Sequence, residues 1–221
     1  AGAAKDVAAR LGDTTLAGLV NNAGVAVAGP LLHLPIADLR RQFEINVTAQ
    51  VAVIQAFAPL LGADRARKGA PGRIVNMSSV AGRIAMPFTG AYAASKHALE
   101  ALTDSLRREL LLYGIDVIAI EPGPIATPIW DKAEQQDYAA FFKTDYKDAV
   151  TRLRAFMLKR GREGLPPEHV AAAVLRAFVA PKPPTRITLL RGKLANWFLP
   201  RILPDRVLDR MVGKRLGLIK D

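Results

Sequence analysis

A tyrosine and a lysine four residues apart, Tyr92 and Lys96, are the side chains of this sequence best suited to moving a proton. Four residues make about one helical turn, so both lie on one face of the helix predicted from about Gly90 to Tyr113. A phenol is a poor base at neutral pH, but an ammonium group beside it favours the phenolate and lowers its pKa of about 10. Ser79 ends the preceding strand and is placed to hydrogen-bond a substrate oxygen. These side chains predict proton transfer to or from an alcohol or carbonyl oxygen.

Three further patterns accompany these residues. Asn21-Asn22-Ala23-Gly24 follows a short apolar run, Asn46 interrupts an amphipathic helix, and Pro122-Gly123 follows another apolar run, with Thr127 four residues later. A Tyr–Lys pair alone is more simply explained as a buried ring beside a solvated lysine. The three further patterns are therefore what favours a catalytic role for the pair. Together the residues resemble the short-chain dehydrogenase/reductase family, above all its hydroxysteroid and retinol dehydrogenase-like members. The motifs match in the family's order from about residue 7 to 190: NNAG at 21–24, Asn46, Ser79, YxxxK at 92–96 and PGxxxT at 122–127.

The resemblance implies an α/β fold, a Rossmann-like doubly wound parallel sheet, with a nicotinamide cofactor, NAD or NADP. It implies hydride transfer that interconverts a secondary alcohol and a ketone. Tyr92 is the implied general acid/base, Lys96 lowers its pKa and holds the nicotinamide ribose, and Ser79 orients the substrate oxygen. Asn46 is implied to break its helix locally and to anchor a water of the proton relay. The implied cofactor contacts are Asn22, Ala23, Gly24, Tyr92, Lys96, Pro122, Gly123, Ile125 and Thr127.

The expected elements alternate between strand and helix along the chain. Apolar runs without polar alternation are typical of parallel strands covered on both faces, and they predict strands at 16–20, 73–78, 115–120 and 186–190. Helices are expected at 1–11, 35–61, 90–113 and 166–179. In the family's strand order, 3-2-1-4-5-6-7, these four strands form the contiguous block from 4 to 7.

The family's opening strand and its glycine-rich pyrophosphate turn, TGxxxGxG, have no counterpart in this sequence. The N-terminal strands of the sheet are therefore expected to be missing, and strand 16–20 becomes an apolar edge. Long apolar edges aggregate unless they are covered. The leading hypothesis is that the sequence represents part of a longer enzyme; the other is that the edge pairs with a second chain.

Two segments outside the sheet carry aromatic side chains. We expect residues 128–165 to form a lid over the substrate, because excursions of this length are usually functional. The aromatic residues of this segment favour a bulky, apolar alcohol or ketone as substrate over a sugar. Residues 192–221 form an amphipathic tail that covers the pocket, packs on a partner subunit or contacts a membrane surface. Both segments are assigned to one single domain, residues 1–221.

The amino-acid composition limits which kinds of site, location and partner are expected. The 221 residues contain no cysteine, which excludes disulfides and zinc–thiolate sites, and the three histidines are scattered, so no metal site is expected. Neither a signal peptide nor a run of about 18 apolar residues is evident, so we expect a cytoplasmic protein without a spanning helix. The net charge is +11, of which +6 falls in residues 186–221. This segment carries no nucleic-acid motif, so nucleic acid is not an expected partner.

An alternative of another class remains open at this point. Without the pyrophosphate turn, the chain has few means of holding a dinucleotide, so it could be a non-catalytic interaction protein with an idle active site. The two hypotheses differ in nicotinamide binding, which only the enzyme requires. The resemblance further implies a homodimer or homotetramer that pairs through the helices holding Asn46 and Tyr92.

Overall fold

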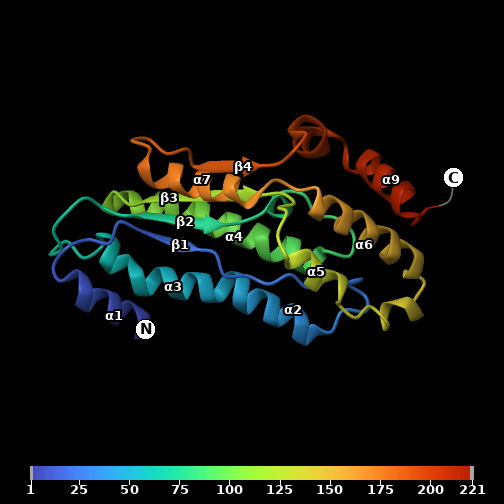
Figure 1. The fold of residues 1–221 in the computed structure, drawn as a ribbon, viewed down its shortest axis with the longest axis horizontal. Helices are drawn as coiled ribbons and strands as arrows, with labels where there is room; N and C mark the ends of the chain where they lie inside the picture. Colours follow the sequence, from blue (N-terminus) through green and yellow to red (C-terminus); the bar gives the residue numbers. More distant parts are fainter. Residues whose placement is uncertain (1, 220–221) are drawn as a thin grey trace.

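Four parallel strands form the centre of the computed structural model, which describes residues 2–219 (Figure 1). In spatial order they are β1 (Gly18–Asn21), β2 (Arg73–Met77), β3 (Asp116–Pro122) and β4 (Arg186–Leu189). Leu19 pairs with Ile74, which pairs with Val117. The predicted α/β parallel sheet and the order of its strands are thus confirmed, although each strand differs from its predicted range by one or two residues at one or both ends.

One face of the sheet is covered by two long helical stretches. The first runs through α2 (Ile36–Phe43), the π-helical turn η1 (Glu44–Thr48), α3 (Ala49–Phe57) and the 3-10 turn η2 (Ala58–Leu61). The second comprises α4 (Gly90–Glu109) and the 3-10 turn η4 (Leu110–Tyr113), and Gly114 ends it in a left-handed conformation. Ile54 and Leu61 pack here against Ile74 and Val117 of the sheet, and the short helix α1 (Gly2–Leu11) precedes β1.

The opposite face is covered by α7 (Pro167–Val179). Ala173 and Ala177 of this helix pack against Val75 and Ile118, the residues that follow Ile74 and Val117 along their strands. Successive residues of a strand point to opposite faces, so each strand supplies both cores. This arrangement explains why the strands read as continuous apolar runs rather than as alternating ones.

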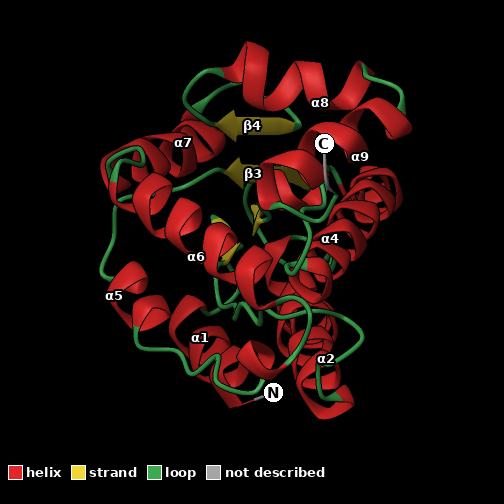
Figure 2. Ribbon diagram, turned by 90° about the vertical axis from the view of Figure 1, so that its right-hand side faces the viewer, coloured by secondary structure: helices red, strands yellow, loops and turns green. Residues whose placement is uncertain are grey.

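Helices also form most of the chain beyond β3. Residues 128–165 contain α5 (Ile129–Glu134), the 3-10 turn η5 (Phe141–Lys143) and the sixteen-residue α6 (Lys147–Arg162), a helix that the sequence analysis did not predict. After β4 come the π-helical turn η6 (Leu194–Phe198), α8 (Leu199–Ile202) and α9 (Asp205–Leu216). Figure 2 shows α6 across the front of the sheet, and α8 and α9 on the side of β4. The last two residues of the predicted tail lie outside the described part.

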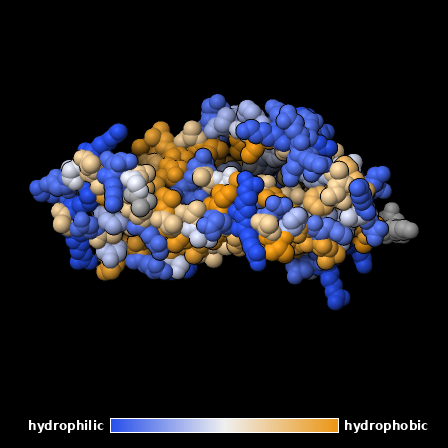
Figure 3. All heavy atoms as spheres, turned by 90° about the horizontal axis from the view of Figure 1, so that it is seen from below, coloured by the Kyte–Doolittle hydropathy of each residue, from blue (hydrophilic) through white to orange (hydrophobic). Residues whose placement is uncertain are grey.

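The edge formed by β1 is apolar and open, as predicted. Val20 in this strand is exposed, as are Val53 of α3 and Ile36 of α2. Figure 3 looks onto the side of the molecule that carries α1, α2 and α3 and shows apolar side chains gathered across its middle. Within residues 2–219 no strand pairs with the outer edge of β1, so its backbone groups face outward.

The helical stretch Ile36–Leu61 corrects one expectation. Its 26 residues are long and apolar enough to cross a membrane by length and composition, whereas the sequence analysis found no such segment. Polar side chains in the middle of the stretch hydrogen-bond the loop after β1, and its C-terminal half packs on the sheet. These contacts attach the stretch to the sheet, and 28% of its most apolar window is buried.

Candidate active site

Ser79 and Tyr92 meet at the carboxyl end of β2. Ser79 begins the 3-10 turn η3 (Val80–Gly82), where its Oγ accepts a hydrogen bond from Ala81 N at 3.1 Å and donates one to Pro122 O at 3.3 Å. Tyr92 lies in the first turn of α4 and shares a hydrogen bond with the Ser79 side chain. The structure therefore joins the two side chains that the sequence separates by thirteen residues.

Lys96 lies one turn after Tyr92 on α4 and is buried. Its Nζ donates a hydrogen bond to Met77 O, the last carbonyl of β2, at 2.7 Å. The same nitrogen is 5.9 Å from the centroid of the Tyr92 ring. The predicted one-turn spacing of the two side chains is confirmed, and both are fixed against the carboxyl end of the sheet.

The protonation of Tyr92 differs from the sequence expectation. Burial raises the pKa of Tyr92 above its ordinary value, and the hydrogen bond with Ser79 lowers it by less. The net shift is opposite to the expected depression, because burial dominates and the ammonium group of Lys96 is directed at Met77 O. Burial lowers the pKa of Lys96 to about 8, against the opposing charge of Glu100. Tyr92 is thus protonated at neutral pH.

Asn46 lies at the centre of the π-helical turn η1, which confirms the predicted local break in the helix ladder. Its Oδ1 accepts from Val25 N at 2.9 Å, and its Nδ2 donates to Val25 O at 2.9 Å and to Ser95 Oγ at 3.1 Å. Ser95 directly precedes Lys96. Asn46 therefore ties the loop after β1 to the helix that carries Tyr92 and Lys96.

Two glutamines, which the sequence analysis missed, also hydrogen-bond the loop after β1 through their side-chain amides. Gln42 bonds Val25 O and Val27 N, and Gln50 donates to Ala23 O at 2.7 Å. Gln42, Asn46 and Gln50 are all buried, although each has a polar side chain. Their spacing of four residues is the signal that identifies them, because it places three amides on one face of an apolar helix.

The predicted cofactor residues after β1 lie beside this amide ladder. Asn22, Ala23 and Gly24 are exposed at the carboxyl end of the strand. A Cβ on Gly24 would lie 3.3 Å from Asn46 Oδ1 and 3.8 Å from Lys96 Nζ. The structure therefore brings the NNAG turn and Lys96 close together.

The predicted cofactor residues after β3 divide into two groups. Pro122 and Gly123 lie at the site: Pro122 O accepts from Ser79, and Gly123 N donates to Leu189 O at 2.7 Å. Ile125 and Thr127 instead contact the start of the 128–165 segment. Ile125 O accepts from the indole of Trp130 at 2.7 Å, and Thr127 O accepts from the backbone N of the same residue.

Aromatic residues of the 128–165 segment pack close to Tyr92. Phe141 is buried against Leu34 and Ala91, and Ala91 directly precedes Tyr92. The ring of Tyr146 meets that of Phe88 edge-on at 5.4 Å. Phe88 adopts a φ of 64°, a left-handed conformation rare outside glycine. The segment thus places the rings of Phe141 and Tyr146 against the start of α4 and the loop before it.

A cluster of buried charges, also missed by the sequence analysis, adjoins the site. Glu100 follows Lys96 by one turn, and its Oε2 accepts from Arg83 at 3.1 Å and from Arg186 at 3.0 Å. Glu121, directly before Pro122, accepts from Thr188 and lies 3.4 Å from Arg83 Nε. Glu100 and Glu121 are 3% and 1% exposed. The cluster links α4, β3, β4 and the loop after η3.

The sequence matches the family model described as short chain dehydrogenase over residues 2–138. The chain is 43% identical over 206 residues to the NADPH-dependent 3-dehydrocapnine reductase of Ornithobacterium rhinotracheale, a match that covers 93% of this chain and 72% of that protein. It is 34% identical over 228 residues to retinol dehydrogenase 5 of Mus musculus, with coverage of 95% and 67%.

Solved structures agree with these matches. A crystal structure of NAD+-bound xylitol dehydrogenase superposes with a TM-score of 0.71 at 26% identity, covering 86% of this chain and 73% of that one. A short-chain dehydrogenase from Streptomyces avermitilis gives a TM-score of 0.70 at 25% identity, covering 100% and 75%. The match to the family model spans more than half of the chain and includes Asn46, Ser79, Tyr92 and Lys96. The chain belongs to the short-chain dehydrogenase/reductase family.

Proposed function

We propose that this chain carries the catalytic site of an NAD- or NADP-dependent oxidoreductase that interconverts a secondary alcohol and a ketone on a bulky, apolar substrate. The observation that carries the proposal is the arrangement at the end of β2, where Tyr92 bonds Ser79 and lies one turn from the buried Lys96. The phenol can transfer a proton to or from the substrate oxygen. The hydroxyl and the ammonium group can stabilise the charge that this transfer creates.

The residues present fit the nicotinamide half of the cofactor. An ammonium group has three N–H donors, and within residues 2–219 the structure gives Lys96 one hydrogen-bond acceptor, Met77 O. The two other donors suit the hydroxyls of the nicotinamide ribose. The exposed turn from Asn22 to Gly24 lies beside them. When bound, the nicotinamide supplies or accepts the hydride.

The raised pKa of Tyr92 favours the reductive direction. A phenol that stays protonated at neutral pH is a general acid, so Tyr92 gives its proton to the ketone oxygen as that oxygen becomes negative. Ser79 Oγ hydrogen-bonds the same oxygen and fixes its position. The Lys96 cation then offsets the charge of the phenolate, while Asn46 holds the helix of Lys96 against the loop after β1.

The proposed substrate class rests on the 128–165 segment, which we propose as a lid. Phe141 and Tyr146 place apolar rings next to Ala91 and Phe88, at the start of α4 and in the loop before it. Such a lining favours an apolar body with one reactive oxygen, because burying unpaired hydroxyls of a sugar against it would cost free energy.

The proposal is tested by reduction of a medium-chain methyl ketone, followed through the absorbance of NADPH or NADH, with xylitol as the polar control for the reverse reaction. We expect Ser79→Ala to lower kcat for the ketone by about 10²-fold, because one hydrogen bond to the developing charge is lost. Nicotinamide binding by this variant should stay unchanged. If wild type binds neither nicotinamide, the proposal fails and the non-catalytic alternative is supported.

The activity should also depend on pH through Lys96. Its pKa is lowered to about 8, so the cation is present at neutral pH and is lost as the pH rises through that value. Reductive kcat/KM should therefore fall above about pH 8, whereas Tyr92 keeps its proton over the same range. The profile of kcat/KM reports the free enzyme and is the measurement of choice. Replacing the exposed Lys182 by Met is the matched control, and a flat profile through pH 8 would contradict the role of Lys96.

A further inference from the structure

Exposed apolar side chains are concentrated in the C-terminal segment, residues 191–219. The described residues include 19 large apolar side chains that are exposed, and eight of them lie in this segment of 29 residues. Leu194 is 79% exposed and Ile202 is 75% exposed. Leu194, Phe198 and Ile202 recur at four-residue spacing, so they form one apolar stripe along η6 and α8. An apolar surface of this density in a protein commonly marks an interaction site.

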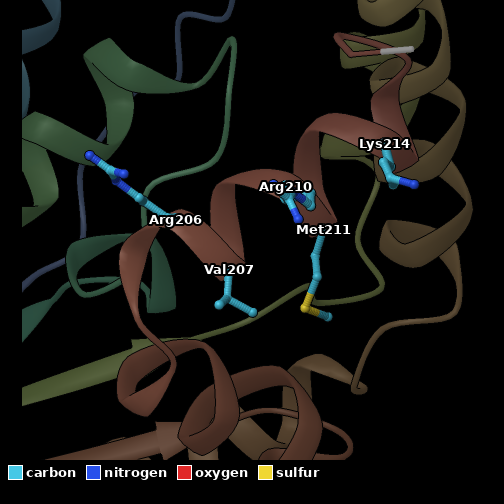
Figure 4. A pocket seen from close by; sticks show the side chains of 5 residues that line it. All are labelled: Arg206, Val207, Arg210, Met211 and Lys214. Carbon is cyan, nitrogen blue, oxygen red and sulfur yellow. The ribbon is translucent and has the colours of Figure 1, made fainter. Parts of the chain in front are cut away.

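A groove of about 320 Å³ adds exposed apolar side chains on α9, the next helix of the segment. Val207 and Met211 project from the same side of the helix in Figure 4, where Arg206, Arg210 and Lys214 also line the groove. The three basic residues recur every four positions: Arg206 and Arg210 directly precede Val207 and Met211, and Lys214 follows Met211 by three residues. The helix therefore presents an apolar strip with a basic strip beside it, the pattern of helices that lie in a membrane interface.

A second depression, of about 360 Å³, adds further positive charge between α6 and the C-terminal segment. Arg215 and Arg160 both stand over the ring of Phe156, at 4.1 and 5.5 Å from its centroid. Its charged lining comprises Lys159, Arg160, Arg191 and Arg215, with Glu163 as the one acidic residue. Arg215 belongs to α9, so this helix contributes basic side chains to both the groove and the depression.

We propose that residues 191–219 bind the surface of an anionic phospholipid bilayer. The apolar side chains of η6, α8 and α9 enter the boundary between headgroups and acyl chains, and the basic side chains bind lipid phosphates. The segment holds seven basic and two acidic residues, so its charge complements an anionic surface. A second copy of the chain would bring the same positive charge to the contact, which disfavours self-association through this face.

The inner side of α9 shows how this surface is held in place. Val212 and Leu216 pack against Leu153 of α6, and the guanidinium of Arg152 lies against Gly217. Side chains needed for the fold and side chains offered to the bilayer thus occupy different sides of α9. Substituting the outer ones leaves the packing on α6 intact, and the inference stands independently of the proposed catalytic activity.

The test is sedimentation of the full chain with vesicles of phosphatidylcholine alone and of phosphatidylcholine with phosphatidylglycerol. We expect binding to the mixed vesicles only, and a decrease as salt is raised, because exposed charges are screened. No binding to the mixed vesicles, or equal binding to both compositions, would overturn the proposal.

Variants then locate the contact. Arg206→Gln with Arg210→Gln should weaken binding to the anionic vesicles about 25-fold, or about fivefold for each charge removed. Phe198→Ser with Ile202→Ser should weaken it at least tenfold through lost apolar burial.

The matched control is Leu111→Ser with Leu112→Ser, two exposed leucines of η4 outside the C-terminal segment. Equal loss in this control refutes the assignment to residues 191–219. A change of oligomeric state in the Phe198 and Ile202 variant, with vesicle binding retained, would instead assign the surface to a second copy.

Discussion

Replacing Tyr92 by Phe is expected to lower kcat for ketone reduction by about 10² to 10⁴-fold, the range that a general acid contributes. The substitution removes one hydroxyl and keeps the ring in its place in the first turn of α4. Ser79 and Lys96 retain their partners, Pro122 O and Met77 O, so the site loses its proton donor without losing its geometry. The measurement is steady-state reduction of the methyl ketone by variant and wild type.

Two controls separate loss of chemistry from loss of structure in this variant. Binding of NADPH, followed by quenching of the fluorescence of the two tryptophans, should be retained, because the other cofactor contacts are unchanged. The thermal midpoint should also stay close to that of wild type. Turnover within tenfold of wild type would remove Tyr92 from the mechanism and, with it, the basis of the proposed function.

Replacing Glu100 by Ala should lower the free energy of unfolding by about 3–5 kcal/mol, the usual cost of removing one partner of a buried ion pair. The carboxylate is 3% exposed and is shared by Arg83 and Arg186, both of which are mostly buried. Its removal leaves two guanidinium groups short of an acceptor. For a chain of this length the midpoint of thermal unfolding should fall by about 10 °C, which calorimetry or circular dichroism would measure.

The same substitution should act on the active site. The charge of Glu100 opposes the effect of burial on Lys96, so without it the pKa of Lys96 decreases further and activity is lost at a lower pH. Glu109→Ala, at the exposed end of the same helix, is the matched control and should leave both the midpoint and the pH profile unchanged. If Glu100→Ala unfolds at the same midpoint as this control, the cluster of buried charges does not stabilise the fold around the site.

The sheet and the central catalytic residues follow from the sequence because their signals are local. Strands buried on both faces read as apolar runs, and the four-residue spacing of Tyr92 and Lys96 fixes their common helix face. Asn46 is also visible in the sequence, because a polar residue in an apolar helix requires a partner. The π-helical turn around it confirms that reading.

Other features depend on contacts between segments far apart in the chain. The pKa of Tyr92 is raised because burial outweighs the hydrogen bond with Ser79, and burial cannot be read from residue spacing. The ion pair of Glu100 with Arg186 joins residues 86 positions apart. By contrast, α6 had a local signal that the sequence analysis overlooked, since Ala149, Val150 and Leu153 recur at helical spacing and pack into one cluster.

The two ends of the 128–165 segment are fastened to each other. Ala126 N donates to Leu165 O at 2.9 Å, and Leu165 N donates to Pro124 O at 3.0 Å. The chain between them is a closed loop anchored on the sheet, and doubling the length of such a loop costs only about 0.6 kcal/mol in closure entropy. The segment therefore leaves and returns at adjacent points, so changes in its length should cost little closure entropy and should leave Ser79, Tyr92 and Lys96 in their positions.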